Sequence, residues 1–289
     1  MPMELELSVI LTTYERPHHL ERSLASLSLQ RNMAGRFEVV VVDDGSKDCT
    51  HDVVRRFARS VDFPVKLTTH EHQGFRVSLC RNDGIRASAG SYVLISDSDC
   101  LFPPHHLEQH LRARKPGVIR AGNCYRLDRA ATERLAVGDV VAGIYHREIS
   151  YKERWRLWRS WISDVRYQLR RHPLKPKLMG FNIAIARSDL EAVNGFDEQY
   201  VGWGCEDDDF AARLRMAGKR VRTVVGYTQA YHMWHPVDPS HPGVWSQGAN
   251  VERLLHGKRE IQCRKGLVYF SSTADADGGC GEQPLHRVA

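Results

Sequence analysis

Two kinds of segment are missing from this sequence, and each absence narrows the class of protein. The longest purely aliphatic run is Val39–Val42, whereas a helix that spans a membrane needs about 20 apolar residues. The first seven residues carry Glu4 and Glu6 and lack a basic stretch followed by an apolar one. They therefore do not resemble a secretory signal. We expect no integral membrane helix and no export.

Paired cysteines are also missing. The seven cysteines are odd in number, and none stands in a Cys-x-x-Cys pair, which argues against a paired zinc motif and against a disulfide framework. Hydrophobic residues at 42% and charged residues at 26% are typical of a globular protein. We therefore expect a reduced, cytoplasmic, globular protein.

Positive charge is in excess, but only in one place. The chain has a formal net charge of +6, and residues 146–177 alone contain 10 Lys+Arg and 3 Asp+Glu. This segment also has apolar residues spaced for one face of a helix: Trp155, Trp158, Ile162, Val165 and Leu169. Two interpretations stay open. The segment attaches to an anionic surface on the inner face of a membrane, or its Trp residues cover the acceptor side of a binding site.

Strand and helix signals alternate in the first half of the chain. Helical periodicity begins near Pro17, Cys49 and Leu79. Short apolar runs that predict strands lie at residues 7–12, 37–42, 65–69 and 92–96. This order predicts an α/β fold with a mainly parallel central sheet and flanking helices. Ligands bind such sheets at the carboxyl ends of the strands.

Acidic residues follow two of these predicted strands. They form the motifs Asp43-Asp44-Gly45-Ser46 and Asp97-Ser98-Asp99. In the second motif, one carboxylate can bind Mg²⁺ or Mn²⁺ while the other orients the ion or holds a ribose hydroxyl. A tight turn with a helix cap explains the first motif equally well, so neither motif decides the function by itself.

Four consecutive acids, Glu206–Asp209, are the most unusual feature of the sequence. In a partly buried cleft, repulsion among them would raise the pKa of one carboxyl. Such a carboxylate can act as a general base toward an attacking hydroxyl. The preceding Gly202-Trp203-Gly204 fits a platform on which a sugar ring stacks, and it argues against a merely solvated helix start.

Three basic groups have both a structural and a functional interpretation. His232 and His235 either hold one metal ion together or are structural. His106 and His110 also have the spacing of metal ligands on a helix, and we interpret them as surface residues. Arg81, near the start of the third predicted helix, contacts a diphosphate or forms a surface salt bridge.

Taken in order, these motifs resemble family 2 inverting glycosyltransferases with the Rossmann-like GT-A fold. The segments that carry the resemblance are Ser8–Tyr14, Asp43–Ser46, Arg81–Gly84 and Asp97–Asp99. The block from Gly195 to Phe210 is similar to the carboxyl-terminal part of β-1,4-galactosyltransferases and bacterial chondroitin-type polymerases. The resemblance covers roughly residues 7–236.

The resemblance implies one domain with two halves. Residues 1–115 would bind the nucleotide sugar, residues 116–270 would bind the acceptor and carry out catalysis, and residues 271–289 would be a disordered tail. The residues implied to bind the donor are Thr12, Tyr14, Arg16, Asp44, Arg81, Asp97 and Ser98. Asp44 would lie near the uracil and Asp97 near the ribose.

The resemblance also assigns the metal, the base and the acceptor contacts. Asp99 would bind Mn²⁺ or Mg²⁺, with His232 and His235 standing where the galactosyltransferases have a methionine and a histidine. Asp207 matches the catalytic base. The residues implied to bind the acceptor are Asn182, Trp203 and Glu206. Cys205 stands where those enzymes have glycine, so the acceptor pocket differs in shape.

The implied activity is metal-dependent, inverting transfer of a sugar from a nucleoside diphosphate, with UDP favoured, to a hydroxyl of a glycan or lipid-linked acceptor. No nucleic acid partner is expected. Two alternatives remain. A nucleotidyltransferase also uses paired acids, but the loop Thr12–Arg16 lacks the glycine of a phosphate-binding loop. A nucleic-acid-binding module would use Arg147–Lys177, although the Trp spacing there is helical.

Overall fold

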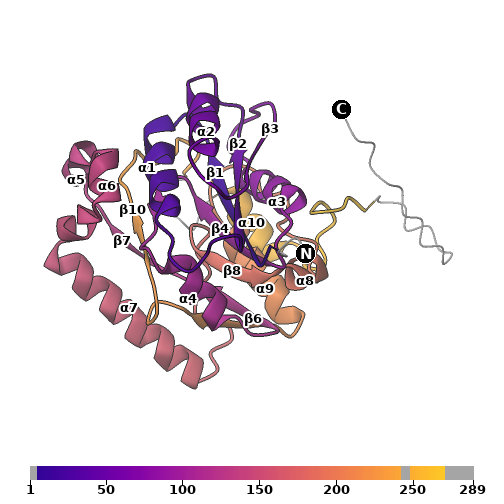
Figure 1. Ribbon diagram of the computed structural model, residues 1–289. Helices are drawn as coiled ribbons and strands as arrows, with labels where there is room; N and C mark the ends of the chain where they lie inside the picture. The colour runs from indigo at the N-terminus through magenta and orange to yellow at the C-terminus, as the bar shows by residue number, and fades with distance from the viewer. Residues whose placement is uncertain (1–4, 242–247, 271–289) are drawn as a thin grey trace.

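A seven-stranded sheet forms the centre of the computed structural model, which describes residues 5–241 and 248–270 (Figure 1). The predicted tail 271–289 lies outside these residues. The strand order is β3-β2-β1-β4-β8-β6-β9. The first four strands are β1 (Leu7–Thr13), β2 (Phe37–Asp43), β3 (Val65–Thr69) and β4 (Tyr92–Asp97). They pair in parallel, which confirms the predicted α/β fold class.

The second half of the chain completes the same sheet. It contributes β6 (Val118–Ala121), β8 (Ile183–Ala186) and β9 (Arg220–Thr223). Strand β8 runs antiparallel to both of its neighbours, β4 and β6. A separate three-stranded sheet consists of β5 (Cys100–Leu101), β10 (Ala230–His232) and β7 (Cys124–Arg126). This small sheet joins the end of β4 to residues more than a hundred positions later.

Helices cover both faces of the large sheet because its strands are apolar on both sides. Every residue of β2 is buried, as expected of a central parallel strand. Alternate residues such as Val9 and Val39 pack with α1 (Pro17–Ser28), α2 (Thr50–Ala58) and α4 (His106–Ala113). Their neighbours Ile10 and Val40 pack on the opposite face, with α3 (Val77–Ala87), α8 (Arg187–Ala192) and α9 (Glu206–Met216).

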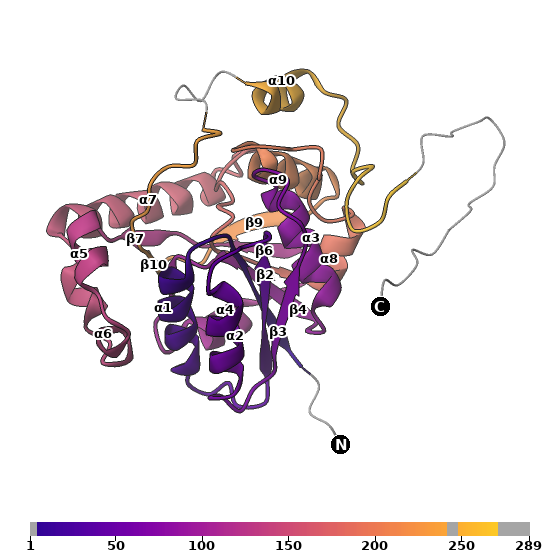
Figure 2. The same ribbon diagram turned by 90° about the horizontal axis from the view of Figure 1, so that it is seen from above.

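The remaining helices lie around this core. They are α5 (Arg129–Arg134), α6 (Val137–Val141), the 3₁₀ helix η1 (Ile144–Glu148), α7 (Tyr151–Leu169) and α10 (Ala249–His256). Figure 2 shows α10 beyond α9, on the side away from the sheet. Across residues 5–241 and 248–270, none of the helices is both long enough and apolar enough to cross a bilayer. The six cysteines in these residues are free.

Helix α7 forms as predicted, with Leu157 as its buried residue and with Trp155 and Trp158 about half exposed. Both interpretations of the segment therefore stay open. One prediction about side-chain burial is wrong. His106 and His110 are fully buried rather than on the surface, because the helix that carries them packs under the sheet.

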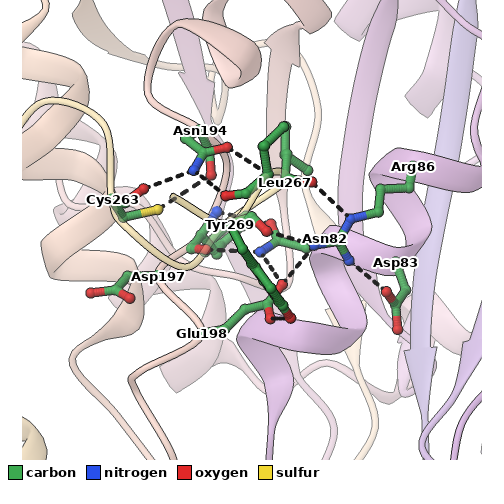
Figure 3. Close-up of polar contacts among 12 residues, drawn as sticks. Asn82, Asp83, Arg86, Asn194, Asp197, Glu198, Cys263, Leu267 and Tyr269 are labelled. Atoms are coloured by element: carbon green, nitrogen blue, oxygen red, sulfur yellow. Dashed lines mark hydrogen bonds and ion pairs between the residues drawn. The ribbon is translucent and has the colours of Figure 1, made fainter. Parts of the chain in front are cut away.

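Residues 248–270, here called the C-terminal clasp, fasten α3 to the segment before α9 (Figure 3). The side-chain amide of Asn194 donates to the carbonyl oxygens of Cys263 and Val268 at 2.7 and 2.8 Å. The guanidinium of Arg86, on α3, donates to the carbonyl of Leu267 at 3.1 Å. The hydroxyl of Tyr269 donates to the carboxylate of Glu198. The clasp thus connects elements that carry motifs from both halves of the sequence.

Candidate active site

Arg81, on α3, links carboxylates from two of the acidic motifs. Its Nη1 donates to Asp207 Oδ1 at 2.9 Å and to Glu206 Oε1 at 3.2 Å, and its Nη2 lies 3.9 Å from Asp97 Oδ1. The Arg81 side chain is only 3% exposed. The guanidinium is thus enclosed by these carboxylates and positions them, while the predicted diphosphate contact stays a prediction.

The path of Arg81 depends on a glycine. A Cβ atom at Gly180 would lie 1.8 Å from Arg81 Nη2, so any side chain there would displace the guanidinium. The backbone N–H of Gly180 also donates to Asp207 Oδ2 at 2.8 Å. Both oxygens of Asp207 are therefore held by donors. Although burial alone would lower the pKa of Arg81, the charges of Asp207 and Glu206 raise it above its usual value, so Arg81 stays cationic.

The four consecutive acids do not face one another unopposed. Asp208 lies 3.2 Å from Lys177 Nζ, and Asp209 pairs with Arg213 at 2.7 Å and with Arg259 at 3.2 Å. All four acids occupy the first turn of α9, where the helix dipole favours negative charge. Cations on several sides and the helix terminus thus offset the repulsion that the sequence predicts.

Cys205 precedes α9 in a conformation that favours glycine. Its φ is +72°, in the left-handed region where L side chains are strained. Its side chain is nevertheless buried and packs with Tyr200 and Val251 of the clasp. The resemblance implies glycine at this position, and the cysteine found here adds packing contacts beneath the turn that leads into the acids of α9.

Glu206, rather than Asp207, is the buried member of the acid pair. Burial raises the pKa of Glu206 to about 7, the charge of Asp207 adds to the rise, and Arg81 opposes it. The Asp207 side chain is 23% exposed. The predicted raised pKa is thus present in this cluster but belongs to the residue beside the one assigned as base.

Glu206 should make the folding stability depend on pH. Its pKa rises from 4.5 in a model carboxyl to about 7 here, so between these values the folded state holds a proton that the unfolded state has released. Stability from this group therefore falls as pH rises through that window. We expect urea unfolding of Glu206→Gln to show a smaller loss of stability from pH 5 to pH 8 than wild type.

The matched control for this measurement is Glu252→Gln, which changes an exposed carboxyl on α10. It should keep the wild-type pH slope. An unchanged slope in Glu206→Gln would contradict the raised pKa.

A candidate metal centre lies beside the Arg81 cluster. Asp99 Oδ2 is 3.0 Å from His235 Nε2, and Asp99 Oδ1 is 3.5 Å from His232 Nε2. The three ligand atoms lie within 4.8 Å of one another. Antiparallel pairing of β5 and β10 sets Cys100 opposite His232, which brings the histidine to the acid. One carboxylate and two imidazoles fit a divalent first-row ion such as Mn²⁺.

The negative charge of the Asp99 carboxylate favours the binding of a metal cation. Burial alone would raise its pKa, but the nearby His232 and His235 hold it well below the usual range. Arg16 Nη1 lies 3.5 Å from Asp99 Oδ2, and its side chain is 32% exposed. Arg16 is therefore better placed than Arg81 to contact an anionic ligand at the candidate metal centre. Sequence reasoning grouped the two arginines, and the structure separates them.

Thr12, near the end of β1, holds the side chain of Asp97, which ends the neighbouring strand β4. The Thr12 hydroxyl donates to Asp97 Oδ1 at 2.9 Å. Burial raises the pKa of Asp97, and the charge of Asp99 adds to this, while Arg81 opposes it. Ser98 is buried and donates to the hydroxyl of Thr13 at 3.1 Å. The Ser98 hydroxyl therefore supports the loop, and its assignment to the donor stays a prediction.

Asp44 is held by two histidines that sequence reasoning missed. His70 Nε2 lies 2.8 Å from Asp44 Oδ1, and His72 Nδ1 lies 3.0 Å from Asp44 Oδ2. The Tyr14 ring stacks on His72 at 4.0 Å. His70 also contacts Asp83 at 3.0 Å. Hydrogen bonds to Asp44 and then Asp83 raise the pKa of His70 to about 12, so it is a cation between two acids.

A sequence signal for these histidines exists. The predicted third strand ends just before them, and its carboxyl end lies at the ligand-binding edge of a parallel sheet. Gly45 also marks this close approach: its φ is +77°, and a Cβ there would lie 2.5 Å from the backbone nitrogen of His72. The predicted turn glycine is required by that close approach as well as by its conformation.

The predicted acceptor residues are not all at one surface. Trp203 and its neighbours line a pocket together with Asn250 of the clasp, whose side chain donates to the carbonyls of Gly202 and Gly204. Asn182 is fully buried. It lies close enough to His106 and His110 to influence the pKa of both. The Asn182 side chain thus lies in the interior, and its contact with an acceptor stays a prediction.

Comparison with known proteins adds the family. Residues 8–117 match the model of glycosyl transferase family 2, and residues 163–236 match the model described as the N-terminal domain of galactosyltransferase. Validoxylamine A glucosyltransferase of Streptomyces hygroscopicus is 30% identical over 232 residues, covering 73% of this chain and 52% of that protein. Chondroitin synthase of Escherichia coli is 28% identical over 245 residues, covering 80% and 35%.

The fold has solved counterparts. A mannosyltransferase of Pyrobaculum calidifontis in complex with GDP-Man and Mn²⁺ superposes with a TM-score of 0.55 at 23% identity, covering 81% of this chain and 58% of that one. TarS of S. aureus in complex with UDP gives 0.56 at 19% identity, covering 80% and 61%. The chain spans about half or less of the length of the curated relatives named above. The family matches favour a glycosyltransferase over both alternatives.

Proposed function

We propose, because residues 8–117 belong to glycosyl transferase family 2, that the protein transfers a sugar from a uridine diphosphate donor to a hydroxyl of a glycan or lipid-linked acceptor, with inversion at the anomeric carbon. The observation that carries this proposal is the cluster at the sheet edge. It brings Asp207, Asp97 and Arg81 together, with the Asp99 centre alongside.

The uridine would bind over the ends of β1 and β2. Tyr14 offers a ring stacked on His72, and Asp44 offers a carboxylate with both oxygens fixed by histidines. A fixed carboxylate suits the imide N–H of a uracil. Asp97, held by Thr12, would accept from a ribose hydroxyl.

His70 should act on donor binding through Asp44. We expect His70→Ala to raise the KM for the donor about tenfold or more, with a smaller effect on kcat, because Asp44 keeps only His72 and loses a charge-assisted hydrogen bond worth about 1.5–3 kcal/mol. Steady-state kinetics over a donor series would measure this.

The matched control for His70→Ala is His51→Ala. His51 contacts Asp43, which keeps its bonds from Ser46 and Thr69. Equal KM changes in the two variants would contradict a specific role for His70.

Asp99, His232 and His235 would hold the divalent ion, for which Mn²⁺ and Mg²⁺ are the proposed candidates. Such an ion, when bound, offsets negative charge on a diphosphate leaving group. Arg16 would add a second positive charge to the same region.

Asp207 would accept the proton of the acceptor hydroxyl. Hydrogen bonds from Arg81 and from the Gly180 N–H fix both of its oxygens, so the carboxylate is oriented before the acceptor arrives. Glu206 and Trp203, next to it, would contact the acceptor sugar. A single displacement on the face opposite the leaving group inverts the anomeric centre.

The test is a screen of sugar nucleotides with Mn²⁺, followed by product analysis. We expect release of UDP from one UDP-sugar, and a new glycosidic bond of inverted configuration by NMR once an acceptor is supplied. Release of pyrophosphate from a nucleoside triphosphate and a sugar phosphate would instead establish a nucleotidyltransferase. The donor sugar and the cytoplasmic location stay predictions.

A further inference from the structure

Helix α7 presents one line of its apolar residues outward. Tyr151 is 81% exposed, Trp155 49%, Trp158 48% and Leu169 79%. Their spacing, together with half-buried Ile162, places them along one line down the helix. We call these five residues the α7 stripe. An apolar line normally faces the core, so this arrangement is reversed.

The opposite side of α7 is firmly attached to the body. Leu157 is buried, the Arg156 guanidinium donates to the carbonyl of Cys124, and Ser160 accepts from the side-chain amide of Asn123 at 3.1 Å. Figure 1 shows α7 along the periphery of the molecule. The outward direction of the stripe is therefore fixed by packing.

Basic side chains flank the stripe. Residues 151–171 contain 7 Lys+Arg and 2 Asp+Glu. One of the two acids, Glu153, is occupied by Arg156. Within the described part of the chain, the exposed cations on the flank have no acidic partner: they are Lys152, Arg159, Arg166 and Arg170. The surface thus combines uncompensated positive charge with indole rings.

These observations select one occupant. We propose that the α7 stripe docks the protein on the surface of an anionic phospholipid membrane. Indole rings suit the interface between headgroups and acyl chains, and a row of cations attracts anionic headgroups. A second copy docking through the same stripe would bring two sets of positive charge together. The rings of Trp155 and Trp158 already stack on each other at 4.8 Å, which leaves less face for nucleic acid bases.

Docking would orient the candidate active site. Helix α7 packs against β7 and β9, and β7 pairs with β10, which carries His232. If the proposed function holds, a membrane-bound α7 keeps the metal centre beside the lipid surface, where a lipid-linked acceptor would lie. The docking itself does not depend on that activity.

The test is co-sedimentation of the full chain with vesicles of phosphatidylcholine containing phosphatidylglycerol, compared with phosphatidylcholine alone. We expect binding to the anionic vesicles, a blue shift of Trp emission, and weakening as salt rises. The double variant Trp155→Ser/Trp158→Ser should bind at least tenfold more weakly. Arg159→Gln/Arg166→Gln should reduce both the binding and its dependence on salt.

The control is Phe270→Ser, which removes another exposed aromatic ring from the C-terminal clasp and should bind like wild type. All variants should retain UDP release, so loss of docking is distinguishable from failure of the proposed function. Absence of wild-type binding to anionic vesicles at low salt would overturn the proposal. Self-association or single-stranded DNA binding that the Trp double variant abolishes, without vesicle binding, would also overturn it.

Discussion

Asp207→Asn is expected to lower the rate of sugar transfer by about 10²–10⁴-fold while donor binding persists. The amide keeps the shape of the side chain, but its single oxygen can accept only one of the two hydrogen bonds that Arg81 and the Gly180 N–H now donate to Asp207. It cannot take the proton of an acceptor hydroxyl, and a positioned base typically contributes a factor of this size. Transfer rates and calorimetric affinity for UDP would be measured on the same preparation.

The adjacent acid provides the control for that experiment. Asp208 faces Lys177 and lies away from Arg81, so Asp208→Asn should leave the transfer rate within a few-fold of wild type. Near-normal turnover in Asp207→Asn would remove Asp207 from the role of base. Glu206 would then be the next group to examine, because its pKa of about 7 suits proton transfer near neutral pH.

Asp99→Asn is expected to lower the rate of metal-dependent sugar transfer by about 10³-fold. The estimate follows from several kcal/mol of charge stabilisation by a bound ion, at about 1.4 kcal/mol for each factor of ten. Removing the carboxylate leaves two imidazoles and one fewer negative charge at the centre. Binding of Mn²⁺, measured by electron paramagnetic resonance without any substrate, should weaken in parallel.

Two further variants test whether the effect belongs to the metal centre or follows from the loss of any acidic side chain. His235→Ala should weaken Mn²⁺ binding, since its Nε2 lies 3.0 Å from Asp99. Asp52→Asn changes an exposed acid on α2 and should change neither metal binding nor rate. Full Mn²⁺ affinity in both Asp99→Asn and His235→Ala would place the ion elsewhere.

Local patterns predicted the first half of the fold well. Strands such as β2 are apolar over their whole length because helices cover both faces, so their sequence alone marks them. The edge where Asp44, Asp97 and Asp99 lie follows from strand direction. The antiparallel insertion of β8 between β4 and β6 carries no comparable signal, because the apolar composition of this four-residue strand does not indicate the direction in which it runs.

The contacts within the site were harder to foresee. The role of Arg81 depends on residues 126 positions away and on a glycine that leaves room for its guanidinium. The burial of His106 and Asn182 depends on which face of α4 meets the sheet. On α7, the apolar spacing predicts a helix face but leaves its direction open, since spacing defines a line and not the side of the molecule that it faces.

The C-terminal clasp lies outside the recognisable motifs, yet its residues help to hold those motifs in place. Every motif of the candidate site ends by His235, and the family matches end at residue 236. Yet Asn250 secures the carbonyls beside Trp203, and Arg253 pairs with Asp197 at 2.8 Å. A chain that ended at the last motif would keep the motif residues but lose the contacts that Asn250 and Arg253 make with the segment before α9. The smallest folded unit that keeps these contacts is therefore longer than the set of motifs.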